Sequence, residues 1–150
     1  MRKQLTSNDI LINNGIDKIY IDLFFKLVDQ SLEGSLNSKS QHEKFLSLCS
    51  KYPNSQRKIF SKIVDILYRN IIFDNDEFDK LHVENGGIMD DADDGFYQDF
   101  GCWVIFRGQQ ILDKFLKNGS EYLIDYIKSL NISDRELTYE NFHYGIDNED

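Results

Sequence analysis

The chain has 150 residues, the length of one ordinary domain, and its 41% hydrophobic content can build a core, which argues against intrinsic disorder. Its 26 acidic residues outnumber 17 basic ones, and the net charge of −9 disfavours binding to the phosphate backbone of DNA or RNA. A single proline and 9 glycines leave few helix breakers, so the composition favours long helices.

The cysteines and the N-terminus indicate the cellular compartment. Cys49 and Cys102 lie far apart in the sequence, without a CxxC spacing or the framework of a disulfide-rich domain, so we expect buried thiols in a reducing environment. The basic start, Met1-Arg2-Lys3, is not followed by the apolar run of a secretory signal. No stretch is apolar for long enough to span a bilayer. We therefore predict a cytoplasmic protein that makes no membrane contact.

The first half of the chain predicts three helices in succession. Residues 1–15 are polar and end in a turn signal, Asn13-Asn14-Gly15, which predicts a loosely held N-terminal arm. A first amphipathic helix is predicted from Ile16 to about Leu32, because apolar residues recur there at helical spacing. Ser40-Gln41-His42-Glu43 has the form of a capping box and predicts the start of the second helix. Pro53 is then expected in the first turn of the third.

The second half shows one longer helical pattern and several short ones. Asp74-Asn75-Asp76-Glu77 predicts the start of a short helix that ends at Gly86-Gly87. After an acidic turn, one long helix is predicted from Phe96 through Lys117 and is closed by Asn118-Gly119. Helices are then expected to start at Ser120 and within Ser133-Asp134-Arg135-Glu136.

No alternation of period two extends over a useful length, so a sheet is not expected. The predicted fold is all-α, a single compact domain of about six or seven short-to-medium helices over residues 16–146, followed by an acidic tail at residues 147–150.

Three short motifs follow one another around the acidic turn: a Gly-Gly turn, an acidic-Gly-Phe step, and a Trp-aliphatic-Ile run followed by Gly. They are Asn85-Gly86-Gly87, Asp94-Gly95-Phe96 with Asp99-Phe100, and Trp103-Val104-Ile105 with Gly108. This series resembles DUF4240, a bacterial family of unknown function. The resemblance extends more weakly to Leu67-Tyr68-Arg69 and to Glu140-Asn141-Phe142-His143-Tyr144.

The resemblance implies a compact, mostly helical domain and no established activity. The chain departs from the family pattern at Gly101, where relatives commonly carry Arg, and at Phe78, where they often carry Trp. If that Arg forms an ion pair with the carboxylates of the acidic turn in relatives, Arg107 is a candidate to replace it here.

The acidic turn has two interpretations. Aligning Gly95 with the glycine of an EF-hand loop puts Ala92 and Gly101 at ligand positions, so an EF-hand is excluded. A divalent-metal site of another kind, built from Asp90, Asp91, Asp93 and Asp94, remains an alternative. The favoured interpretation is structural: Asp93 or Asp94 caps the long helix, and the other acids lie near its positive end.

No signature of catalysis stands out. The histidines, His42, His82 and His143, form no metal-binding pair at short spacing, although His82 precedes the acidic turn and could act with it in acid–base chemistry. There is no GxSxG motif, and Cys102 has no basic neighbour to lower its pKa. Gly86-Gly87 lacks the residues of a phosphate-binding loop.

Gly101 and Gly108 would share one face of the predicted long helix, together with Ile105 and Leu112. Small residues allow another helix to approach closely, and packing within the chain is the favoured use of that face. Self-association through it is a further alternative. The sequence therefore leaves the choice between monomer and homodimer open.

Charge and the lack of catalytic signatures together favour a non-enzymatic protein-binding module, of the kind represented by bacterial immunity proteins and antitoxins, that neutralises a basic partner. No cofactor is expected. The predicted contact residues are Glu84, Asp90, Asp91, Asp93, Asp94, Asp147, Glu149 and Asp150. The alternative is a metal-dependent hydrolase or other enzyme built on His82, Asp90, Asp94 and His143.

Overall fold

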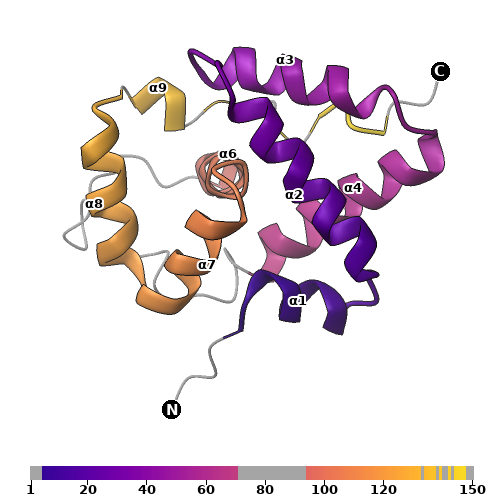
Figure 1. Cartoon of the computed structure of the whole chain (residues 1–150). Coiled ribbons are helices and arrows are strands. Elements are labelled where there is room, and N and C mark those ends of the chain that lie inside the picture. Colours follow the sequence, from indigo (N-terminus) through magenta and orange to yellow (C-terminus); the bar gives the residue numbers. More distant parts are fainter. Residues whose placement is uncertain are drawn as a thin grey trace.

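A computed structural model describes residues 5–70, 94–132, 134–137, 139, 142 and 144–147, and within these ranges no strand occurs. The predicted all-α class is confirmed, and Figure 1 shows the helices gathered into one body. They are α1 (Ser7–Asn13), α2 (Lys18–Leu32), α3 (Ser38–Cys49), α4 (Asn54–Tyr68), α6 (Asp94–Ile105), α7 (Gln109–Asn118), α8 (Ser120–Leu130) and α9 (Asp134–Leu137).

Helix α6 lies in the middle of the molecule, where Figure 1 shows it end-on with the other helices around it. Every residue from 100 to 106 is buried, including Trp103, so this stretch is apolar on all sides, as a central helix must be. Phe106, which follows α6, packs between Phe45 and Phe142 at ring-centroid distances of 4.9 and 4.7 Å. The core is thus built around the aromatic end of α6.

The long helix predicted from Phe96 through Lys117 is wrong, because the chain forms two helices there. Gly108 separates α6 from α7 and has φ 103° and ψ 166°, a backbone conformation that no helix contains. The break has a packing reason. Residues 100–106 are buried on every side, whereas α7 buries Leu112 and Phe115 and exposes its other face. The break at Gly108 lets α7 leave the direction of α6 and pack against α1 and α8. Gly101 and Gly108 consequently share no helix face, which removes the basis of the self-association alternative.

The loosely held arm predicted for residues 1–15 is also wrong over most of its length. Ser7–Asn13 forms α1, which begins with a capping box between Thr6 and Asp9 and buries Ile10 and Leu11.

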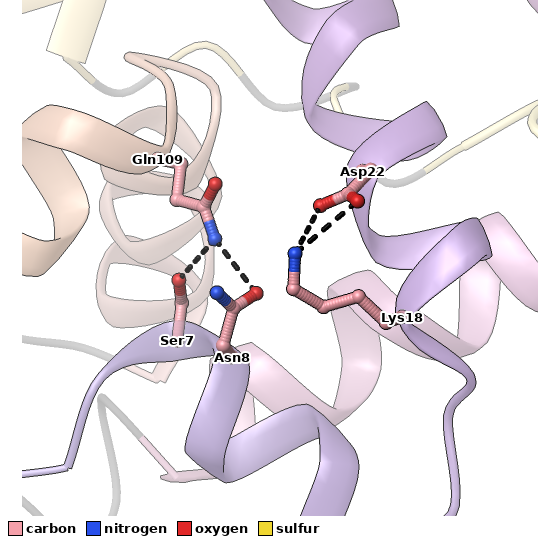
Figure 2. A network of polar contacts seen from close by, with 5 residues as sticks. All are labelled: Ser7, Asn8, Lys18, Asp22 and Gln109. Carbon is pink, nitrogen blue, oxygen red and sulfur yellow. Dashed lines mark hydrogen bonds and ion pairs between the residues drawn. The ribbon is translucent and has the colours of Figure 1, made fainter.

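Polar contacts with α7 fix this helix, and Figure 2 shows the Gln109 side chain reaching two residues of α1. Gln109 Nε2 donates to Ser7 Oγ at 3.1 Å and to Asn8 Oδ1 at 3.0 Å, while the Ser7 backbone N–H donates to Asp113 Oδ1 at 2.7 Å. A capped turn with a buried apolar pair is therefore ordered by tertiary contacts despite its polar composition.

The start of α3 lies earlier than predicted. Asn37 is the N-cap, and Ser40 completes the capping box from the third helical position instead of opening the helix. The reason is the extended backbone of Asn37, at φ −159° and ψ 176°, whose side-chain oxygen accepts from the Ser40 N–H at 2.8 Å.

Other predicted boundaries agree closely with the structure. Helix α2 ends at Leu32 as predicted, and Gly119 closes α7 just before α8 starts at Ser120. Pro53 stands directly before α4, one position ahead of its expected place in the first turn. In the described ranges, no helix combines the length and the apolar character needed to cross a membrane.

Candidate functional site

Most of the predicted site residues lie outside the described part of the chain. These are Glu84, Asp90, Asp91, Asp93, Glu149 and Asp150 of the binding hypothesis, and His82 and His143 of the enzyme alternative. Asp94 is the first residue of α6, and Asp147 is partly exposed after the buried Ile146. The described geometry therefore tests neither the acidic cluster nor the metal interpretation of the turn.

Two further acids, which were not predicted as a site, lie at the C-terminal end of α2: Asp29 within the helix and Glu33 as its C-cap residue. Asp29 and Glu33 are exposed, stand one helical turn apart, and form no ion pair with any described cation. Partial burial, and secondly the charge of Glu33, raise the pKa of Asp29. Like charges at this spacing destabilise a helix by about 0.2–0.5 kcal/mol. Stabilisation of α2 therefore does not explain the pair.

Other exposed carboxylates repeat this arrangement on α8. Glu121 and Asp125 are exposed one turn apart and have no cationic partner among the described residues. Ion pairs are described within α2, between Lys18 and Asp22 at 2.9 Å, and at the end of α4, between Arg69 and Asp65 at 3.2 Å. Several carboxylates on the described surface are thus available to an external cation.

A polar contact between Gln41 and Arg107 lies inside the helical body. Gln41 Nε2 donates to Ser31 Oγ at 3.2 Å and to the Phe106 carbonyl at 2.7 Å, and its Oε1 accepts from Arg107 Nη2. All hydrogen-bonding groups of the amide are then occupied. Gln41 therefore ties α2 and α3 to the turn that follows α6.

Arg107 is held by core groups. Its Nε donates to the Trp103 carbonyl at 3.1 Å, and the guanidinium carbon lies 4.5 Å from the centroid of the Trp103 ring. Burial lowers the pKa of Arg107 to about 10, against the opposing effects of Tyr126 and Glu136. It remains a cation at neutral pH. The described contacts of Arg107 are structural. Residues 84–93 of the acidic turn lie outside the described part of the chain, so the structure does not test whether Arg107 pairs with them.

His42 joins α3 to the end of the chain. Its Nε2 lies 3.1 Å from the Tyr144 carbonyl, which can only accept, so Nε2 carries the proton of the neutral ring. Nδ1 then accepts from the Tyr139 hydroxyl at 3.0 Å. Burial lowers the pKa of His42, and this effect outweighs the opposing effects of the Tyr144 carbonyl and of Glu43. His42 is thus a neutral structural residue at physiological pH.

The thiols offer no nucleophile. Cys49 and Cys102 are free and buried, as predicted, and burial raises the pKa of each to about 12. Within the described ranges, no group of three or more His, Cys, Asp or Glu side chains is arranged to hold a metal ion. Neither thiol is therefore ionised at neutral pH, as a cysteine nucleophile must be.

The roles of Gln41 and His42 were not predicted from the sequence, because both residues fall inside the capping-box motif Ser40-Gln41-His42-Glu43. Spacing could have revealed Gln41, since Gln41, Phe45 and Cys49 recur every four residues and all three are buried. No local signal points to Tyr139 and Tyr144, which lie 97 and 102 positions from His42 in the sequence.

Comparison with protein-family models, curated proteins and solved structures gives no match for the chain. The resemblance to DUF4240 therefore stays a prediction.

Proposed function

We propose that this protein is a non-enzymatic, cytoplasmic binding module, similar in role to bacterial immunity proteins and antitoxins, that neutralises a basic partner protein. The observation that carries the proposal is the excess of acid: the net charge is −9, and four exposed carboxylates form no ion pair with a described cation, namely those of Asp29, Glu33, Glu121 and Asp125. Such a surface accelerates encounter with a basic protein and favours its binding over that of an acidic one.

The described reactive groups support the same proposal. Both thiols are held protonated, His42 is bonded at both ring nitrogens, and Arg107 is engaged with Gln41 and Trp103. Each of these groups thus has a structural role. We also propose that residues 16–146 form a DUF4240-type domain, on the motifs from Asn85 to Gly108.

Affinity capture from lysate of the native host, followed by titration of the captured protein at increasing salt, tests the binding proposal. We expect a basic protein whose affinity falls as salt rises, because screening weakens attraction between exposed charges. Replacing Asp90, Asp91 and Asp93 by Asn should weaken binding by about tenfold or more, equivalent to roughly 1.4 kcal/mol. Failure to capture a basic protein, or unchanged binding by this variant, would contradict the proposal.

Two matched variants locate the contact surface. Asp29→Asn with Glu33→Gln, and Glu121→Gln with Asp125→Asn, each remove two exposed charges one helical turn apart. Equal small losses of partner affinity for both variants would indicate long-range attraction alone, whereas a larger loss of affinity for one variant would mean that the partner contacts that helix.

Metal analysis of protein purified without chelator separates the proposal from the alternative of a metal-dependent hydrolase, which requires a bound metal.

A further inference from the structure

The turn between α2 and α3 presents one leucine almost entirely to solvent. Leu36 is 92% exposed, a larger fraction than that of any other exposed large hydrophobic residue in the described chain. Figure 1 shows this turn at the outer edge of the molecule, where α2 ends and α3 begins. Single exposed apolar residues are common on protein surfaces, so exposure alone gives Leu36 no function. What distinguishes Leu36 is the ordered and charged turn that holds it.

Hydrogen bonds fix the turn in this conformation. The Ser40 hydroxyl oxygen accepts from the backbone N–H groups of Leu36 and Asn37, at 3.1 Å each. Asn37 caps α3, and Lys44 Nζ donates to the Glu33 carbonyl at 2.5 Å. Leu36 is therefore held outward by an ordered backbone, and a partner that buries it does not have to order the turn on binding. Such preorganisation lowers the entropic cost of association.

Charged side chains of opposite sign stand on either side of Leu36. Glu33 lies three residues before it and Lys39 three residues after it, and both side chains are exposed. Neither forms an ion pair with a described residue. Asp29 adds a second exposed acid one helical turn before Glu33. The end of α2 is thus an acidic side of the turn, and the start of α3 is a basic side.

The region around the turn is nearly balanced in charge, although the whole molecule is strongly negative and repels its own copies. Residues 29–44 contain three acids, counting Glu43, and two bases, counting Lys44, so their net charge is −1, compared with −9 for the chain. At physiological ionic strength the screening length is about 8 Å, so the charges nearest a contact dominate it. A basic partner would meet Lys39 here, whereas two copies related by a two-fold axis can set the acidic side of each against the basic side of the other.

We propose that the turn between α2 and α3 is a self-association surface, through which two copies of the chain form a two-fold symmetric dimer. The Leu36 side chains bury each other near the axis, and Glu33 of each copy faces Lys39 of the other. The dimer uses neither Gly101 nor Gly108, and it does not depend on the proposed binding of a basic partner. A contact centred on one turn is small, so the dimer is weak and exchanges with the monomer.

Sedimentation equilibrium of the purified full chain, from about 10 µM to about 1 mM in about 0.15 M NaCl, tests the dimer. We expect the average mass to rise from the monomer value toward twice that value. Leu36→Ser should weaken association by about tenfold or more, because the central apolar contact is lost. Ile19→Ser is the matched control, since it removes another apolar side chain, 71% exposed, from the start of α2. Both side chains are exposed, so both variants should fold, and only the first should lose association.

A charge exchange tests the two-fold pairing. Glu33→Lys and Lys39→Glu each place like charges opposite one another in their own dimers, so each variant alone should associate less than the unmodified chain. An equal mixture of the two variants should regain association, because both contacts of the mixed dimer then join opposite charges. A monomeric mass at every concentration, equal association of Leu36→Ser and Ile19→Ser, or a mixture no more associated than its components would each overturn the proposal.

Discussion

Gln41 illustrates how one polar side chain can hold several elements together. It is almost completely buried, and its amide contacts Ser31, the Phe106 carbonyl and Arg107. A buried polar network of this kind stabilises the fold when every member is bonded, and destabilises it when one partner is lost.

Gln41→Leu keeps the approximate side-chain volume and removes all three hydrogen bonds. We expect a loss of about 3 kcal/mol in the free energy of unfolding, because the Phe106 carbonyl and the Arg107 guanidinium lose their Gln41 partner inside the protein. Urea denaturation monitored by circular dichroism measures it. The control is Gln110→Leu on the exposed face of α7, which should change stability by less than about 0.5 kcal/mol. Equal urea midpoints for the two variants would contradict this role of Gln41.

At the scale of elements, the break between α6 and α7 decides where the helices can pack. Gly108 adopts a conformation that is essentially restricted to glycine, and a Cβ built on it would lie 2.9 Å from Asp29 Oδ1. The turn therefore depends on the absence of a side chain for two separate reasons, backbone strain and the closeness of α2.

Gly108→Ala should lower stability by about 1–3 kcal/mol from backbone strain, with a further loss from contact with Asp29. Gly34→Ala is the control, since Gly34 also has a positive φ, of 71°, but open space around its Cβ position. Thermal denaturation of Gly108→Ala, Asp29→Ala and the double variant isolates the contact, and the double variant should lose less than the sum of the single losses. A Gly108→Ala variant no less stable than Gly34→Ala would show that the close approach is unimportant.

At the scale of the whole molecule, negative charge is not balanced on the described surface. The described ion pairs, Lys18–Asp22 and Arg69–Asp65, are exposed, and such pairs contribute little to stability. Self-repulsion across a net charge of −9 should therefore exceed local attraction.

Raising NaCl from about 0.02 M to about 0.3 M should accordingly increase the Tm by about 2–4 °C, the change that roughly 1 kcal/mol produces in a domain of this size. Scanning calorimetry measures the shift. The variant with Glu121→Gln and Asp125→Asn, whose net charge is −7 instead of −9, should show a smaller rise. A Tm that falls with added salt would mean that attraction dominates the surface.

The sequence by itself determined the all-α class and the bounds of helices with strong local signals. Helix α2 repeats apolar residues at a regular helical spacing, and α7 and α8 meet at Gly119, so near neighbours in the sequence carry the information.

Only the tertiary structure decided that Ser7–Asn13 is ordered, that the chain breaks at Gly108, and that Gln41 and His42 face inward. Their partners lie far along the chain: Asp113 and Gln109 for α1, Phe106 for Gln41, and Tyr139 and Tyr144 for His42. Local propensity contains no information about such contacts, because they arise when separate helices bury their apolar faces together.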